Sequence, residues 1–113
     1  MTGESDYERF RAICLALPEA TERETWEHPT FRVRDKIFAS CAGDGSSLGF
    51  KADPSELDVL LADGRFERAK YVGRYGWLAM TRPPVAGDWD EIDELVRSSY
   101  MLIAPKTLRN RIG

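Results

Sequence analysis

The sequence has few residues that bind metals or form cross-links. His28 is its one histidine, and Cys14 and Cys41 are its two cysteines. A single histidine excludes the multi-histidine metal sites that one chain can build by itself. The two cysteines are far apart, lack the CxxC spacing of a redox or zinc motif, and each lies in an apolar pattern. We therefore expect two buried, reduced thiols, no metal and no cofactor.

Long apolar runs and a signal peptide are also missing. No stretch approaches the ~20 apolar residues of a membrane-spanning helix. The first six residues are polar and acidic, unlike a secretory signal. We expect a cytoplasmic protein with no membrane partner. The 113 residues suit a single domain over residues 1–113, and a domain of this size can bury a core without disulfides.

Recognisable catalytic motifs are absent as well. The sequence has no GxxxxGK[ST] phosphate loop, and its GxSxG string at residues 45–49 overlaps the predicted hairpin turn and the strand after it, not the strand-to-helix turn of a nucleophile elbow. His28, flanked by Glu24 and Glu27, could act as a general base. It precedes Pro29 at a predicted turn, which favours a structural or surface role. The carboxylates of residues 88–94 lack EF-hand spacing and fit a solvated helix face. We expect no catalytic residues, and a protein that is not an enzyme.

Three segments carry the same helix-opening signal, an N-cap oxygen followed three residues later by Glu. These helices are predicted to begin at Ser5, Asp53 and Asp88. Apolar residues then recur at helical spacing in each segment, and Pro18 ends the first helix. A fourth, short helix is predicted to begin near Pro105.

Between these helices the apolar period changes from 3.6 to 2, which is typical of strands. The alternating segments are residues 31–34, 36–41, 48–51, 68–71 and 77–81, with residues 22–27 as a candidate edge strand. Ile37, Ala39 and Cys41 alternate with Lys36, Phe38 and Ser40, and Arg68 and Lys70 alternate with Ala69 and Tyr71. Residues 44–47 (DGSS) predict a hairpin turn. The order of elements predicts an α+β fold, a single two-layer domain in which helices pack on one face of an antiparallel sheet.

The net charge of −3 is unevenly distributed along the chain. Residues 52–64 and 83–96, where helices are predicted, carry −4 and −5, whereas the strand regions 29–51 and 65–82 carry +2 and +4. If the helices cover one face of the sheet, the cations of the strands populate the other, with aromatic side chains among them. Such a face suits phosphates and bases. The candidate nucleic-acid-binding residues are Arg32, Arg34, Lys36, Lys51, Arg68, Lys70, Arg74 and Trp77.

Several short segments resemble the MmcQ/YjbR family in their order and spacing. They are residues 26–33 (WEHPTFRV), 35–39 (DKIFA), 48–54 (LGFKADP), 70–73 (KYVG) followed by Trp77, and 94–102 (ELVRSSYML). The resemblance implies a fold similar to CyaY, the bacterial frataxin, and a DNA-binding function. Family members often have Gly where this chain has Glu27 and Asp35. We therefore expect Asp35 to accommodate a tight turn between two strands.

Alternatives to DNA binding stay open at this point. The basic face could be a solvated surface whose charges pair locally. The acidic helices could dock a protein partner, and the chain itself is expected to be a monomer or a weak dimer. A small-ligand pocket could lie near Trp26, His28, Lys36, Lys51 and Trp77, and a deep apolar cleft there would favour that interpretation.

Overall fold

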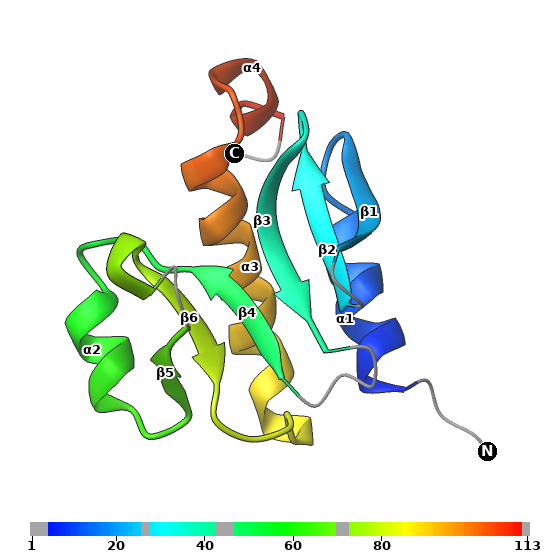
Figure 1. The fold of residues 1–113 in the computed structure, drawn as a ribbon. Coiled ribbons are helices and arrows are strands. Elements are labelled where there is room, and N and C mark those ends of the chain that lie inside the picture. The colour runs from blue at the N-terminus through cyan, green and yellow to red at the C-terminus, as the bar shows by residue number, and fades with distance from the viewer. Residues whose placement is uncertain (1–4, 26–27, 43–46, 70–72, 112–113) are drawn as a thin grey trace.

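The computed structural model describes residues 5–25, 28–42, 47–69 and 73–111 of the chain (Figure 1). Its elements in chain order are α1 (Asp6–Leu15), β1 (Ala20–Thr25), β2 (His28–Val33), β3 (Lys36–Cys41), β4 (Leu48–Lys51), α2 (Leu57–Ala62), β5 (Phe66–Arg68), η1 (Gly73–Tyr75), β6 (Trp77–Met80), η2 (Ala86–Asp88), α3 (Trp89–Ile103) and α4 (Lys106–Arg109). The order of helices and strands confirms the predicted α+β class. None of the helices in these ranges combines the length and the hydropathy that a bilayer crossing requires.

The described strands form one six-stranded antiparallel sheet in the order β1-β2-β3-β4-β6-β5. Helices α1 and α3 pack on one face of this sheet, and α2 lies beside β5 at its edge (Figure 1). The core fills the space between sheet and helices. Its largest fully buried side chains include Tyr100, Phe10, Phe31, Phe38, Leu48 and Leu78. No helix among the described residues covers the opposite face of the sheet.

Helix α1 begins after Ser5 and helix α3 begins after Asp88, as predicted. Ser5 caps α1, since its hydroxyl accepts a hydrogen bond from the Glu8 N–H while the Glu8 carboxylate accepts one from the Ser5 N–H. One stripe of α3 faces the core. It consists of Trp89, Ile92, Leu95, Val96, Ser99 and Tyr100. This burial is what stabilises a 15-residue helix in the domain.

Two predicted boundaries differ from the structure. Helix α2 begins after Glu56 and not at Asp53, because the Asp53 carboxylate accepts a hydrogen bond from the Ser55 N–H at 2.8 Å and closes a turn before the helix. Strand β5 covers Phe66–Arg68, so it begins two residues before the predicted segment 68–71. Residues 44–46 of the predicted hairpin turn lie outside the described ranges.

The turn between β2 and β3 has positive φ at both central residues, Arg34 (50°) and Asp35 (66°). Two-residue hairpins of this geometry favour Asn-Gly, so two residues with longer side chains are strained here. Ion pairs hold them in place, Arg34 with Glu19 at 2.7 Å and Asp35 with Arg23 at 3.3 Å. The expectation that Asp35 accommodates a tight turn is confirmed.

Both cysteines, Cys14 and Cys41, are buried thiols that form no disulfide with each other, as predicted. Burial raises the pKa of the Cys14 thiol far above its usual range, and the nearby Cys41 adds a smaller contribution. The Cys14 thiol is therefore protonated at neutral pH. It acts as a small apolar residue of the core and not as a nucleophile.

A β-bulge at Phe38 interrupts the predicted alternation of β3. Phe31 pairs with Ala39 and Arg32 pairs with Ile37, so Phe38 has no partner residue on β2. The Phe38 side chain is consequently fully buried, on the same side as Ala39. Its ring lies edge-on against the ring of Tyr100, with centroids 5.3 Å apart.

Ser99 of α3 completes the hydrogen bonding of β3 and β4 beside this bulge. Its hydroxyl donates to the Phe38 carbonyl at 2.6 Å and accepts from the Lys51 N–H at 2.9 Å. The direct pairing of the two strands ends at Ala39 and Phe50, so the hydroxyl bridges them where the ladder stops. Ser99 is fully buried, and its hydroxyl satisfies both peptide groups because it donates and accepts at the same time.

Replacing this hydroxyl is expected to destabilise the fold. Ser99→Ala leaves a buried N–H and a buried C=O without a partner and should lower the free energy of unfolding by about 2–4 kcal/mol. The adjacent Ser98→Ala removes a hydroxyl from a half-buried position and should change it by less than about 0.5 kcal/mol. Urea denaturation of the two variants measures both values. Equal effects of the two substitutions would show that the bridge contributes nothing.

Candidate nucleic-acid interface

The face of the sheet opposite α1 and α3 carries two rows of side chains that cross the strands, and we call it the open face. The strand register aligns the first row, which is Arg23, Thr30, Ser40, Gly49, Ala79 and Glu67. The second row is Arg32, Ile37, Lys51 and Trp77, in which Arg32 pairs with Ile37 and Lys51 pairs with Trp77. The centre of the first row has small side chains, whereas the second row has long or bulky ones.

Three of the predicted binding residues, Arg32, Lys51 and Trp77, lie together on the open face. Arg34 lies in the turn between β2 and β3, and Lys36 follows it as the first residue of β3. These two exposed cations therefore lie at one end of the sheet and not among the side chains of the open face.

Arg68 does not lie on the open face, so that prediction is wrong. It pairs with the core residue Leu78 and therefore shares the helix-covered side of β5, where its guanidinium donates to the Gly73 carbonyl at 3.0 Å. The reason is that Phe66 is the buried residue of β5, so Arg68, two positions further on, shares its side and Glu67 lies on the open face. Lys70 and the Arg74 side chain lie outside the described part of the chain.

Sequence analysis missed Arg23, a cation of the edge strand β1 that lies on the open face. Arg23 and Arg32 both reach the Asp35 carboxylate, at 3.3 and 3.6 Å, and the Asp35 side chain is 78% exposed. Arg32 also donates to the Thr30 hydroxyl at 3.3 Å. Lys51 has no ion pair with any residue in the described ranges. Because residues two positions apart share one face of a strand, assigning residues 20–25 to a strand would have placed Arg23 on the same face as Thr21.

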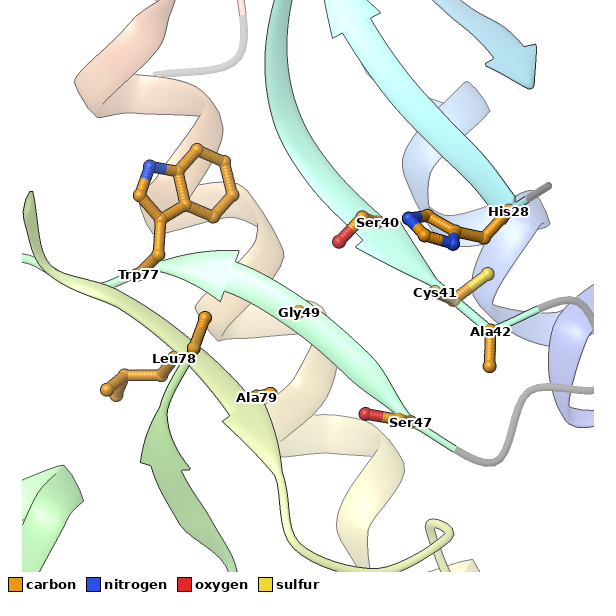
Figure 2. A pocket seen from close by; sticks show the side chains of 10 residues that line it. His28, Ser40, Cys41, Ala42, Ser47, Gly49, Trp77, Leu78 and Ala79 are labelled. Atoms are coloured by element: carbon orange, nitrogen blue, oxygen red, sulfur yellow. The ribbon is translucent and has the colours of Figure 1, made fainter. Parts of the chain in front are cut away.

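A hollow of about 280 Å³ lies on the open face between Trp77 and His28 (Figure 2). Figure 2 shows the Trp77 indole and the His28 imidazole on opposite sides, with Ser40 and Gly49 between them. A Cβ atom at Gly49 would lie only 2.9 Å from the Ser40 Oγ, so the absence of a side chain here keeps the centre of the hollow low. Ala79, the partner of Gly49 on β6, adds another small side chain.

The hollow contains two of the residues predicted to line a small-ligand pocket, His28 and Trp77. Lys36 and Lys51 are not among the lining residues, and Trp26 lies outside the described residues. Lys51 is nevertheless the register partner of Trp77. A cation is therefore placed next to the hollow, and the hollow itself is lined by small and aromatic side chains.

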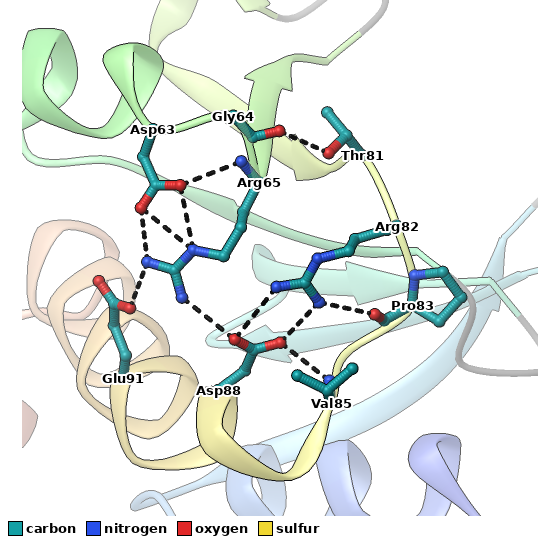
Figure 3. A network of polar contacts seen from close by, with 9 residues as sticks. All are labelled: Asp63, Gly64, Arg65, Thr81, Arg82, Pro83, Val85, Asp88 and Glu91. Carbon is teal, nitrogen blue, oxygen red and sulfur yellow. Dashed lines mark hydrogen bonds and ion pairs between the residues drawn. The ribbon is translucent and has the colours of Figure 1, made fainter.

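A second cluster of charges, centred on Asp88, connects the β5–β6 hairpin to the beginning of α3 (Figure 3). Asp88 was predicted to cap this helix, but its carboxylate makes no cap hydrogen bond and is 6% exposed. It accepts from Arg82 at 2.8 Å, from the Val85 N–H at 2.8 Å and from Arg65 at 3.2 Å. Both arginines donate to this nearly buried carboxylate, so we expect them to contribute to stability.

Hydrogen bonds lower the pKa of two carboxyl groups in this cluster. Those from Arg82 and from the Val85 N–H hold the pKa of Asp88 well below its usual range. Those from Arg65 lower the pKa of Asp63 to about 2. Arg65 also pairs with Glu91 of α3 at 2.6 Å. The cluster therefore depends on ionised carboxylates, and acid is expected to weaken it.

A groove of about 480 Å³ runs between α2 and α3, on the acidic side of the molecule. It is lined by Glu56, Val59, Leu60, Glu91, Glu94, Leu95 and Ser98. Within the described residues, no group of three or more histidine, cysteine or acidic side chains is arranged to hold a metal ion. The groove combines an apolar floor with an acidic rim.

This chain is similar to a protein family and to a solved structure. The model of the YjbR family matches residues 15–102, a range that contains strands β1 to β6 and most of α3. A crystal structure of a structural-genomics target from Pseudomonas syringae is similar to this chain, with a TM-score of 0.56 and 17% sequence identity, and the match covers 75% of this chain and 87% of that chain. At this identity the likeness shows the fold alone. A search of the curated proteins finds no match.

The Asp88 cluster generates a prediction about stability and pH. Asp88→Asn should lower the free energy of unfolding at pH 7 by about 1.5–3 kcal/mol, because two guanidinium groups lose a buried carboxylate. Asp90→Asn, on the exposed side of the same helical turn, should cost less than about 1 kcal/mol.

The pH dependence follows from the lowered pKa of Asp88. The stabilisation is present above the pKa of an unfolded Asp, about 4, and is lost as the pH falls further. The difference between wild type and Asp88→Asn should therefore shrink between about pH 5 and pH 2, which denaturation at several pH values measures. A difference that stays constant over this range would contradict the assigned role of the carboxylate.

Proposed function

We propose that this chain, which belongs to the YjbR family, is a nucleic-acid-binding module without catalytic activity that uses the open face of its sheet. The observation that carries the proposal is the pairing of Lys51 with Trp77 on that face. A cation beside a half-buried aromatic ring is the combination that contacts a phosphate and stacks on a neighbouring base.

Two further cations support phosphate binding on the same face. Arg23 and Arg32 share one carboxylate, Asp35, that is 78% exposed. The Arg23 side chain is 63% exposed, so its pair with Asp35 contributes only about 0–1 kcal/mol and a phosphate of the ligand can replace the carboxylate at little cost. The Arg23 guanidinium then presents a fork of donors to the phosphate oxygens, whereas the Arg32 side chain, 15% exposed, adds positive charge beside it.

The distribution of acidic residues favours an approach from the open face. Helices α2 and α3 carry exposed carboxylates such as Asp58, Asp90 and Glu94, and these helices lie at the edge and on the covered face of the sheet. A polyanion is repelled from those surfaces and attracted to the cations opposite. Two acidic side chains, Glu67 and Asp35, lie near the cations of the described open face. Because they partly offset the positive charge, we expect a modest affinity that is mainly electrostatic.

Charge reversal on the open face tests this proposal. Arg23→Glu combined with Lys51→Glu should raise the Kd for a labelled 20-nucleotide single strand at least about tenfold in about 50 mM salt, because two phosphate contacts become repulsive. Arg97→Glu combined with Lys106→Glu makes the same change in net charge on exposed helical positions and should raise it less than about threefold.

Fluorescence anisotropy at several salt concentrations measures both variants and the salt dependence of the wild type. The proposal requires affinity that falls steeply with salt. Absence of binding in low salt, or equal losses in the two variants, would contradict it.

A second candidate function is the docking of a basic protein segment in the groove between α2 and α3. Val59 is 73% exposed at this groove, whereas Leu60 and Leu95 are buried at its floor. The Glu56 and Glu94 carboxylates have no ion pair with any described residue. An apolar floor with unpaired carboxylates around it is complementary to a helix that carries leucine and lysine side chains.

This docking is tested with a labelled synthetic helix in which leucines recur at helical spacing among lysines. Val59→Ser combined with Glu94→Lys should weaken its binding at least about tenfold and leave nucleic-acid binding unchanged. A peptide with the same lysines but with serine in place of leucine is the matched control and should bind more weakly. Equal binding of the two peptides, or unchanged affinity of the variant, would exclude the groove as a docking site.

A further inference from the structure

The hollow between Trp77 and His28 is a recess on the open face, and electrostatic attraction of phosphates to cations does not explain its shape. It holds about 280 Å³ and is bounded by aromatic rings on two sides (Figure 2). Phosphate binding requires exposed cations on the surface but does not require a recess. The shape of the hollow therefore points to a second part of the same ligand.

The walls of the hollow fit a flat ring. Trp77 is half-buried, so its indole is held in place while one part of its surface stays accessible. Aromatic side chains of this kind stack on nucleobases, which all present a flat π-face. His28 on the other side of the hollow is exposed and supplies a second ring.

The centre of the hollow fits the edge of a base. Ser40, Gly49 and Ala79 are register neighbours on β3, β4 and β6, and none of them projects beyond a hydroxymethyl group. The Ser40 hydroxyl makes no hydrogen bond within the described ranges, and a hydroxyl can donate to or accept from a base edge. Gly49 is required for this shape, since its Cβ would lie 2.9 Å from the Ser40 Oγ.

We infer that the hollow holds one unpaired nucleobase, stacked on Trp77, while a phosphate beside it contacts Lys51. This inference rests on the proposed function and specifies its ligand as a single strand. In a duplex each base is paired and stacked, so it can enter a recess only after it has been unpaired and flipped out at a cost. The adjacency of Lys51 and Trp77 in the register places the cation next to the base and not beneath it.

The test compares three probes of equal length on the wild-type protein. They are a single-stranded oligonucleotide, the same sugar–phosphate chain with every base absent, and a duplex. The single strand should bind at least about fivefold more tightly than the baseless chain, because stacking adds to phosphate contacts. It should also bind more tightly than the duplex.

Two variants locate the base-dependent part of the affinity. Ala79→Leu fills the hollow from a half-buried position on the open face, and Trp77→Ala removes its aromatic wall. Either variant should reduce the preference for the single strand over the baseless chain to less than about twofold, while the affinity for the baseless chain stays the same. Circular dichroism confirms that each variant is folded, and Gly49→Ala provides a smaller filling of the same space.

The outcomes separate this inference from the proposed function. Equal affinity for the single strand and the baseless chain overturns the base site and leaves the electrostatic proposal intact. A preference for the duplex, or a base preference that survives in both variants, also overturns the base site. Failure of all three probes to bind in low salt overturns the proposed function itself.

Discussion

The hydroxyl of Ser99 connects the two halves of the sheet, and the open face depends on that connection. Strands β3 and β4 pair directly only from Ala39 to Cys41, and beyond this point the hydroxyl joins the Phe38 carbonyl to the Lys51 N–H. The same hydrogen bond fixes the backbone of Lys51, and therefore the position of its register partner Trp77. A buried helix residue thus determines where the cation and the ring lie on the surface opposite the helix.

Charge is separated by the same architecture. Helices α2 and α3 carry exposed carboxylates such as Asp58, Asp90 and Glu94, and the open face carries Arg23, Arg32 and Lys51. A net charge of −3 is therefore compatible with a polyanion as ligand, because the ligand meets the local charge and not the sum. A charge count by segment does not show which cations are already paired inside the fold, and the arginines near β5 and β6 are examples. Arg65 and Arg82 are engaged by Asp88 and contribute to stability instead.

Local signals in the sequence predict much of the fold. The capping box at Ser5 and the apolar periods of α1 and α3 depend on residues a few positions apart, and the structure confirms them. The Ser99 bridge depends on contacts 48 and 61 residues apart, which periodicity does not contain. Arg68 was assigned to the wrong face because Ala69 and Tyr71 were expected to be the apolar side of this strand, whereas its buried residue is Phe66 and Arg68 lies on the same side as Phe66.

The central claim is that a single-stranded nucleic acid lies across β3, β4 and β6 on the open face, and nuclear magnetic resonance tests it most directly. Titration of isotope-labelled protein with a single-stranded oligonucleotide in low salt follows every backbone amide and the indole N–H groups. The account predicts the largest shifts at Ser40, Gly49, Ala79 and the Trp77 indole, with α2 and α3 unchanged. Shifts confined to the groove between α2 and α3, or no shifts at all, would contradict it.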